Sequence, residues 1–197
     1  TPLIFASRNG HTDTVATLIA SGASVRATTN KGDTALTLAS TLGNVDVVRA
    51  LLVCKSDVNH RTVDGDTPLN KACRNQNAEV ATHLIVWNAD VNTSGKRKVT
   101  PLMYASERTG GSFLVSLLLG RGAQTHGHDE NGWTALMYAC EVANVDTVRL
   151  LVREGCDVNA VEKRGFTALS IATKHTVNAD RYSRSEKGED SIEIISL

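Results

Sequence analysis

The sequence of 197 residues is poor in several features that would assign it to particular protein classes. Aromatic residues make up only 4%, so a core must be built mainly from small aliphatic side chains. No uninterrupted run of about 18 apolar residues occurs, so no transmembrane segment is predicted. Lysine plus arginine number 21, as do aspartate plus glutamate, and this zero net charge argues against a general nucleic-acid binder.

Cysteines are few and widely spaced, which bears on the compartment of the protein. Cys54, Cys73, Cys140 and Cys156 form no C-x-x-C pair. This pattern favours free thiols in a reducing compartment over a disulfide framework or a zinc site. We therefore expect a cytoplasmic protein, with the nucleus as an alternative.

Familiar catalytic motifs are also missing from the sequence. It contains no G-x-S-x-G, no G-x-x-x-x-G-K-(S/T), no H-E-x-x-H and no G-x-G-x-x-G. The one cluster that resembles a metal site runs from His126 to Glu130, and we interpret it as a solvated polar turn. We expect no catalytic residue, no cofactor and no metal ion.

A regular repeat is the strongest feature that the sequence does contain. The tripeptide Thr-(Pro/Ala)-Leu begins at Thr1, Thr34, Thr67, Thr100, Thr134 and Thr167. The steps between these threonines are 33, 33, 33, 34 and 33 residues. Self-similarity at a period of this length is typical of stacked structural repeats.

The physics of one unit follows from its residue types. Thr34 can accept a hydrogen bond at the start of a helix, and Leu36 and Ala39 then share the buried face of that helix. Apolar residues recur at helical spacing over 45–52 and predict a second amphipathic helix. Gly65 then permits a tight turn. No such unit can bury its apolar face alone, so neighbouring units must stack.

Two further signals share this period and identify the family that the chain resembles. Short runs similar to Gly-Ala-Asp-Val-Asn recur along the chain. Their valines are Val25, Val58, Val91 and Val158. A glycine lies two residues before most of the threonines, at Gly32, Gly65, Gly132 and Gly165. Together with Thr-Pro-Leu, this pattern resembles the ankyrin repeat family over essentially the whole chain. The resemblance implies an all-α solenoid of helix-turn-helix units with β-turn finger loops, forming a single domain over 1–197.

Three departures from the pattern lead to local expectations. The third finger has Lys98 where the others have glycine, so we expect a different turn, around Gly95. The fourth unit carries one extra residue near 109–111. The last unit has a long polar inter-helix loop at about 176–190. Because the first unit lacks a preceding finger and the last ends inside a predicted helix, we expect a piece of a longer chain with further domains.

The resemblance also implies where a protein or peptide partner would bind. In this family the partner surface is usually the concave side, formed by the finger tips and the ends of the first helices. Trp133 and Phe166 hold equivalent finger positions in adjacent units, and such aromatic residues often dominate binding energy. The other candidates are Asn131, Arg164, Arg108, Tyr104, Tyr138 and Val142. The alternative is that the aromatic rings fold back and pack within the protein.

The leading hypothesis is therefore a non-catalytic protein-interaction scaffold, and one alternative has residues of its own. Lys96, Arg97 and Lys98 form the one basic run, which could serve a phosphate- or nucleotide-sensing domain of a larger channel or enzyme. Without a phosphate-binding glycine loop, this function is the second choice.

The resemblance suggests one modification as well. Asn59, Asn92 and Asn159 each follow a leucine by eight residues, a context in which ankyrin asparagines are hydroxylated by an oxygenase. A structural role in the turn is the alternative for these asparagines. Asp57, Asp90 and Asp157 recur two residues earlier, and we expect their carboxylates to stabilise the same turn.

Overall fold

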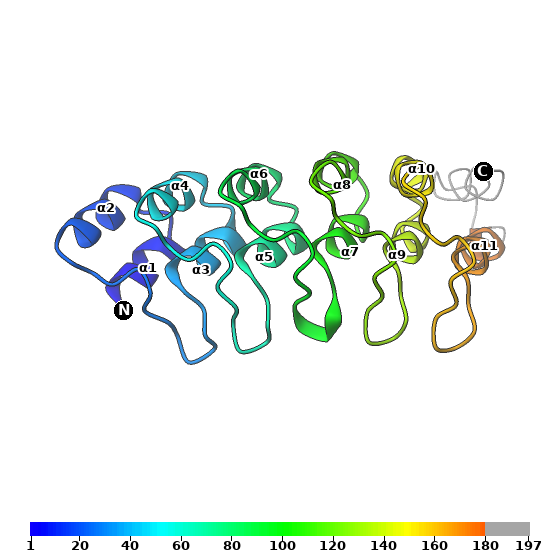
Figure 1. The fold of residues 1–197 in the computed structure, drawn as a ribbon, viewed down its shortest axis with the longest axis horizontal. Coiled ribbons are helices and arrows are strands. Elements are labelled where there is room, and N and C mark those ends of the chain that lie inside the picture. Colours follow the sequence, from blue (N-terminus) through cyan, green and yellow to red (C-terminus); the bar gives the residue numbers. More distant parts are fainter. Residues whose placement is uncertain (180–197) are drawn as a thin grey trace. The chain divides into compact units, whose positions relative to one another are not determined.

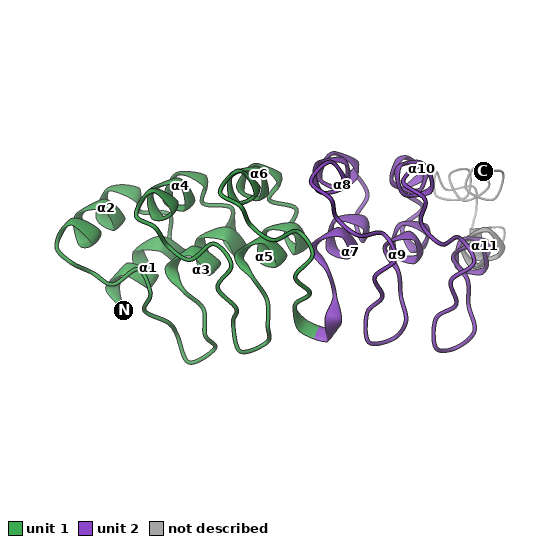
Figure 2. Ribbon diagram, viewed as in Figure 1, with its two compact units in different colours: residues 1–96 green, residues 97–197 purple. Residues whose placement is uncertain are grey.

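A computed structural model describes residues 1–179, which form short helices joined by turns and projecting finger loops (Figure 1). The chain clusters into two compact units, unit 1 over Thr1–Lys96 and unit 2 over Arg97–Leu197 (Figure 2). The described residues contain no strand beyond an isolated bridge between His128 and Thr134. Over the same residues, no helix is long and apolar enough to cross a membrane.

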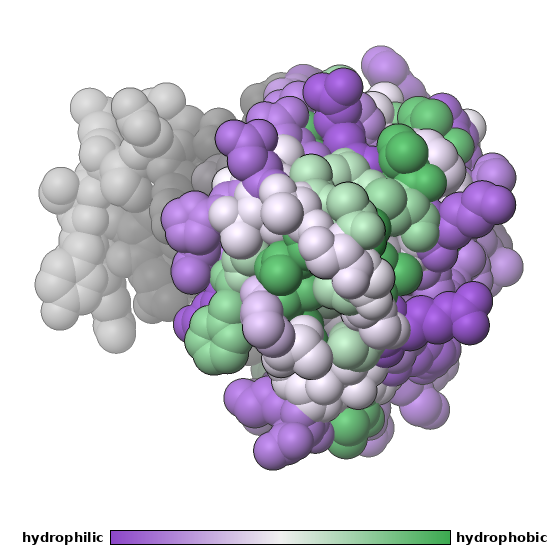
Figure 3. All heavy atoms as spheres, turned by 90° about the vertical axis from the view of Figure 1, so that its left-hand side faces the viewer, coloured by the Kyte–Doolittle hydropathy of each residue, from purple (hydrophilic) through white to green (hydrophobic). Residues whose placement is uncertain are grey.

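Unit 1 consists of three helix pairs. The helices are α1 (Pro2–Arg8), α2 (Thr12–Ala20), α3 (Ala35–Leu42), α4 (Val45–Val53), α5 (Pro68–Arg74) and α6 (Ala78–Val86). The first helices of the pairs contact one another in the order α1, α3, α5, and the second helices in the order α2, α4, α6. A view onto the N-terminal end of this unit shows apolar residues at the centre and polar residues around them (Figure 3).

Unit 2 repeats this arrangement. Its helices are α7 (Pro101–Ser106), α8 (Ser112–Leu119), α9 (Ala135–Glu141), α10 (Val145–Arg153) and α11 (Ala168–Ala179). Helices α7, α9 and α11 contact in series, and α8 contacts α10. A short 3-10 turn, η1 (Lys96–Lys98), contains the boundary between the units. The prediction of an all-α repeat fold is confirmed.

The repeated threonine begins the first helix of each pair, as the sequence predicts. Its hydroxyl accepts a hydrogen bond from the backbone N–H three residues later, which satisfies one of the unpaired donors of the first turn. The threonines with this bond are Thr1, Thr34, Thr67, Thr100, Thr134 and Thr167. The leucine two residues after the first five of them is buried. The tripeptide therefore combines a helix cap with a core residue.

Asparagines join consecutive helix pairs within each unit. The side-chain amide of Asn44 donates to the carbonyls of Ser7 and Arg8 at 2.9 and 3.1 Å. Asn77 donates in the same way to the carbonyls of Ser40 and Thr41 in α3, at 2.9 and 3.1 Å. Asn144 donates to Arg108 O at 3.0 Å. These bonds satisfy carbonyls that the ending helices leave open, so they fix the spacing of neighbouring repeats.

The fingers are five loops, which we number in chain order: 29–33, 62–66, 95–99, 129–133 and 162–166. In four of them a glycine two residues before the threonine has a positive φ, for example 76° at Gly32. The third finger uses Lys98 at that position with φ 60°, and Arg97 is also left-handed at 59°. The finger therefore turns differently, as expected, but the turn lies at Arg97 and Lys98 and not around Gly95. Gly95 instead allows a close approach, because a Cβ there would overlap Asp66 Oδ1.

Of the other two irregular segments, only the extra residue of the fourth repeat lies where the sequence places it. The extra residue of the fourth repeat falls between α7 and α8, where Gly110 has φ 87° and Gly111 precedes the second helix. Helix α11 continues to Ala179, so the first four residues of the loop expected at about 176–190 are helical instead. The rest of the predicted loop at 176–190 lies outside the described residues.

Candidate functional site

The fourth finger, in unit 2, is organised around one buried carboxylate. Asp129 is only 3% exposed. Its Oδ1 accepts hydrogen bonds from the backbone N–H groups of Asn131 and Trp133, both at 2.8 Å. Its Oδ2 accepts the hydroxyl of Tyr138 at 3.0 Å. Asp129 thus fixes the finger and ties it to helix α9.

These bonds hold two aromatic rings together at the base of the finger. The ring centroids of Trp133 and Tyr138 lie 5.2 Å apart, with the ring planes tilted by 54°. Both side chains are half-buried. Burial, together with the negative charges of Asp129 and Glu107, raises the pKa of the Tyr138 hydroxyl well above its usual range. The hydroxyl therefore stays a neutral donor, and the pair offers a rigid, partly exposed aromatic surface.

The fifth finger repeats the device with a glutamate. Glu162 is 5% exposed, and its Oε1 accepts the backbone N–H groups of Arg164 at 2.8 Å and Phe166 at 3.2 Å. Phe166 is half-buried. The fingers are also joined through their backbones, because Lys163 N donates to Asn131 O at 3.0 Å. The fourth and fifth fingers therefore form one connected surface.

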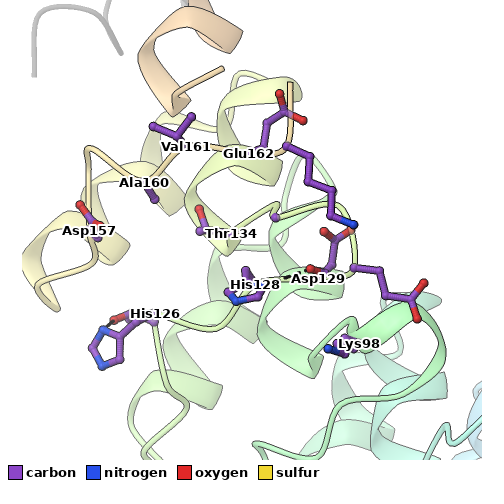
Figure 4. A pocket seen from close by; sticks show the side chains of 13 residues that line it. Lys98, His126, His128, Asp129, Thr134, Asp157, Ala160, Val161 and Glu162 are labelled. Carbon is purple, nitrogen blue, oxygen red and sulfur yellow. Dashed lines mark hydrogen bonds between the residues drawn. The ribbon is translucent and has the colours of Figure 1, made fainter. Parts of the chain in front are cut away.

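A groove of about 520 Å³ lies between these fingers (Figure 4). One of its walls carries His128, Asp129 and Thr134, and the other carries Asp157, Ala160, Val161 and Glu162. The charged side chains that line it are Lys98, Lys163, Asp129, Glu130, Asp157 and Glu162. The acids outnumber the lysines by four to two, so the groove has an acidic character. We call it the finger groove.

The remaining partner candidates divide by exposure. Asn131, Arg164 and Arg108 are exposed, and Val142 is half-buried at the end of α9. Tyr104 is only 5% exposed, so the packing alternative applies to it, and it cannot offer a partner its ring. The interaction surface suggested for unit 2 thus loses Tyr104 and keeps the others as candidates.

The basic run does not assemble an anion site. Lys96 Nζ pairs with Asp64 Oδ2 at 3.2 Å in unit 1. Arg97 and Lys98 begin unit 2 with left-handed backbones, and Lys98 lines the acidic finger groove. A phosphate group would meet more carboxylates than ammonium groups there, which disfavours the phosphate-sensing alternative.

The aspartates and asparagines that recur at equivalent positions of the repeats are hydrogen-bonded within the turns. Asp57, Asp90 and Asp157 each accept the backbone N–H of the asparagine two residues later, at 2.8–3.0 Å, which confirms their predicted role. Hydrogen bonds from Thr93 and Asn92 lower the pKa of the Asp90 carboxyl.

The three asparagines themselves differ in exposure. The side chain of Asn59 donates to Asn88 O at 3.3 Å and accepts Asp90 N at 2.9 Å, so it links two repeats. Asn59 and Asn159 are exposed, and Asn92 is half-buried. Hydroxylation of any of them stays a prediction.

The histidine cluster and the cysteines form no evident reactive centre in the described part of the chain. No group of three His, Cys, Asp or Glu side chains within it could hold a metal ion. His126 Nδ1 contacts the Thr125 hydroxyl at 3.2 Å, and His128 Nδ1 contacts Asp129 O at 3.1 Å. Burial raises the pKa of the Cys140 thiol to about 12, so this thiol is a poor nucleophile.

Sequence reasoning missed the carboxylates that organise the fingers. Asp129 and Glu162 lie five residues before the repeated threonine, where the first two fingers have Thr29 and Thr62. The position could have been noticed from this spacing, but its two backbone bonds become visible only in the folded finger. Asp66, which lies one residue before a repeated threonine, is also buried, with 1% of its surface exposed.

Comparisons with known proteins agree with the repeat architecture. The family model described as ankyrin repeats (3 copies) matches residues 1–62, 47–125 and 102–181. The human NAD-capped RNA hydrolase NUDT12 is 47% identical over 53 residues, covering 25% of this chain and 12% of that protein. The ankyrin repeat and LEM domain-containing protein 1 homolog of Caenorhabditis elegans is 36% identical over 91 residues, covering 46% and 13%.

A third relative extends the pattern. The ankyrin repeat and SAM domain-containing protein 6 of Rattus norvegicus is 41% identical over 73 residues, covering 36% of this chain and 8% of that protein. The chain thus spans about a tenth of the length of these curated relatives. The short match to the hydrolase gives no support for hydrolase activity in this chain.

Proposed function

We propose that this chain, which belongs to the ankyrin repeat family, is a non-catalytic scaffold that binds a protein or peptide through the fingers of unit 2. Ankyrin repeats are generally protein-interaction modules. The proposal adds the surface, formed by Trp133, Phe166 and Tyr138, with Asn131, Arg164, Arg108 and Val142 around them. We call this set the finger surface.

The fixed aromatic pair of the fourth finger is the observation that carries the proposal. Trp133 is held at its backbone by Asp129, and its ring lies 5.2 Å from that of Tyr138. Both rings remain partly exposed, so a partner could cover the rest of their apolar area. Pre-ordered aromatic side chains bind tightly because little conformational entropy is lost when the partner docks.

The test compares partner binding by the wild-type chain and two alanine variants. Proteins captured by the wild-type chain are identified and purified, and their dissociation constants are then measured for Trp133→Ala and Phe166→Ala. We expect each substitution to weaken binding by about 2 kcal/mol, or roughly thirtyfold, if the ring is an anchor.

Phe113→Ala is the matched control, because Phe113 is an exposed aromatic residue of unit 2 that lies on helix α8 and not on a finger. It should leave the dissociation constant unchanged. Circular dichroism verifies that all three variants keep their helices. Equal affinities for the wild type, Trp133→Ala and Phe166→Ala would exclude the finger surface as the binding site.

The setting of this scaffold is part of the same proposal. Four free cysteines favour a reducing compartment, so we place the chain in the cytoplasm, with the nucleus as an alternative. The small share that it covers of its relatives is consistent with a repeat domain attached to further domains. Sensing of a phosphate or nucleotide is the second choice, and a thermal-shift screen with nucleotides tests it.

A further inference from the structure

We propose that the finger groove of unit 2 binds a cationic side chain, lysine or arginine, from an extended segment of the protein partner. The inference rests on the proposed function and specifies the chemistry of the partner. It is carried by the charge of the groove, by the burial of two of its carboxylates and by a comparison with the fingers of unit 1.

The groove offers negative charge that the described residues do not neutralise by contact. Asp129 and Glu162, both more than nine-tenths buried, line it from adjacent fingers. Among residues 1–179, neither carboxylate has a lysine, arginine or histidine nitrogen within 4.0 Å. Lys98 and Lys163 also line the groove, and both residues are exposed and form no such pair.

One carboxylate oxygen is left over when the finger is complete. Both finger bonds of Glu162 end on Oε1, and Oε2 has no hydrogen-bond partner in the described part of the chain. This oxygen is not among the fully buried atoms that lack a partner, so solvent reaches it although the residue as a whole is 5% exposed. The unused oxygen therefore offers a ligand with N–H donors a site that the fold itself does not fill.

The turn does not require a charge at this position. In the first finger, the neutral Thr29 accepts Lys31 N at 3.2 Å and Asp33 N at 3.1 Å through its hydroxyl. In the second finger, the hydroxyl of Thr62 accepts no bond, yet the backbone bonds of the turn still form. A threonine could therefore accept the same backbone N–H groups in unit 2. The negative charges of Asp129 and Glu162 are not needed to form the turns.

The walls of the groove suit a long cationic side chain. Ala160 and Val161 provide apolar surface on one wall, and Thr134 lies across from them (Figure 4). Lysine and arginine have apolar stems that cover such surface while the charged head reaches a carboxylate. An acidic or phosphorylated segment would instead be repelled by the excess of carboxylates.

The experiment uses acetylated, amidated hexa-arginine as the probe and the full chain labelled with ¹⁵N. We expect the probe to shift the amide signals of residues 125–134 and 157–166. Asn131, Trp133, Arg164 and Phe166 should report most directly, since their N–H groups donate to the two carboxylates. Hexa-glutamate of the same length should shift none of these signals.

Glu162→Gln tests the charge while keeping an oxygen for the finger bonds. It should weaken hexa-arginine binding about tenfold, because one of the two buried charges is gone. Asp13→Asn removes an equal charge from exposed α2 in unit 1 and should leave binding unchanged. Glu162→Thr serves as a second variant with a precedent at Thr29, in case glutamine disturbs the finger.

Three outcomes would overturn the inference: no shifts within the groove, equal weakening by Glu162→Gln and Asp13→Asn, or stronger binding of hexa-glutamate. The proposed function is tested separately by the Trp133 and Phe166 variants. A purified partner that loses affinity for Trp133→Ala but not for Glu162→Gln would uphold the scaffold and reject the cationic anchor.

Discussion

The second finger, in unit 1, and the fourth finger, in unit 2, both bury an aspartate, and the two carboxylates have different kinds of partner. Asp66 is paired with Lys71 Nζ at 3.1 Å and Arg74 Nη1 at 3.6 Å, and it accepts Lys96 N at 2.8 Å. Asp129 accepts two backbone N–H groups and the Tyr138 hydroxyl, and no ion pair joins it to another described residue.

One repeat position on the first helix explains why the two aspartates have different partners. Lys71 and Tyr138 both lie four residues after the repeated threonine, so the same point on the first helix faces the finger in each unit. A lysine there completes an ion pair inside the protein. A tyrosine there completes a hydrogen bond and leaves the aspartate without an ion pair to any described residue. The difference teaches that one repeat scaffold can use a buried acid either for its own stability or for a ligand.

Asp66→Ala should produce the largest effect and would confirm that the acid in unit 1 is structural. It removes the buried partner of Lys71 and the acceptor of Lys96 N. We expect a loss of about 3 kcal/mol in the free energy of unfolding, because breaking a buried pair leaves uncompensated polar groups. Urea unfolding measures this loss. Asp46→Ala, which breaks the exposed Asp46–Arg49 pair, should cost less than about 1 kcal/mol.

Gly95→Ala tests the packing of the third finger against Asp66. It should lower the free energy of unfolding by about 2 kcal/mol. The new Cβ would overlap Asp66 Oδ1, so the third finger must move away from Asp66. Thermal unfolding followed by circular dichroism measures the change. Gly122→Ala is the control: the Cβ would meet nothing within 4 Å, so only its φ of 81° causes strain. A loss for Gly95→Ala no larger than for the control would contradict this packing.

Tyr138→Phe should cost about 1 kcal/mol at neutral pH, because it removes one hydrogen bond to Asp129. The raised pKa of Tyr138 also predicts a pH dependence. Above the usual tyrosine pKa of about 10, the unfolded chain loses the proton while the folded chain keeps it, so stability falls as pH rises. The difference between wild type and Tyr138→Phe should therefore shrink in alkaline urea titrations. A constant difference from pH 7 to pH 11 would count against it.

Glu162→Thr should have the smallest effect on stability, within about 0.5 kcal/mol of the wild type. Threonine accepts the equivalent pair of finger bonds at Thr29, so the turn is expected to survive. Urea unfolding beside the hexa-arginine titration separates the two roles. If stability collapses, Glu162 is structural in the way that Asp66 is, and the contrast between the units disappears.

Much of the fold could be predicted from the repeat pattern, because the hydrogen bonds that start the helices and form the turns join residues close in sequence. Thr34 caps a helix through a bond to Thr37 N, three residues away, and such contacts can be inferred from spacing. Turns at Asp57 and Asp157 follow the same logic. The position of the turn in the third finger could not be inferred from local spacing. Lys98 takes the left-handed conformation that glycine takes elsewhere, and the need for glycine at position 95 comes from its close approach to Asp66.

The candidate site was less accessible to prediction. Trp133 and Phe166 stood out by composition, but their half-burial depends on how each finger closes over its own acid. Tyr104 and Tyr138 share one repeat position, yet only Tyr138 keeps partial exposure. Side chains at equivalent positions thus differ through their neighbours in space, which a single sequence does not give.

The sequence by itself determined the repeat, its helix starts and its turns, because these depend on hydrogen bonds and periodicity within about ten residues. Only the tertiary structure decided which charges are neutralised. Asp66 meets Lys71 and a finger 30 residues away, whereas Asp129 and Glu162 meet no cation in the described chain. The physical reason is that the cost of a buried charge is set by what packs against it, and packing joins residues that are distant in sequence.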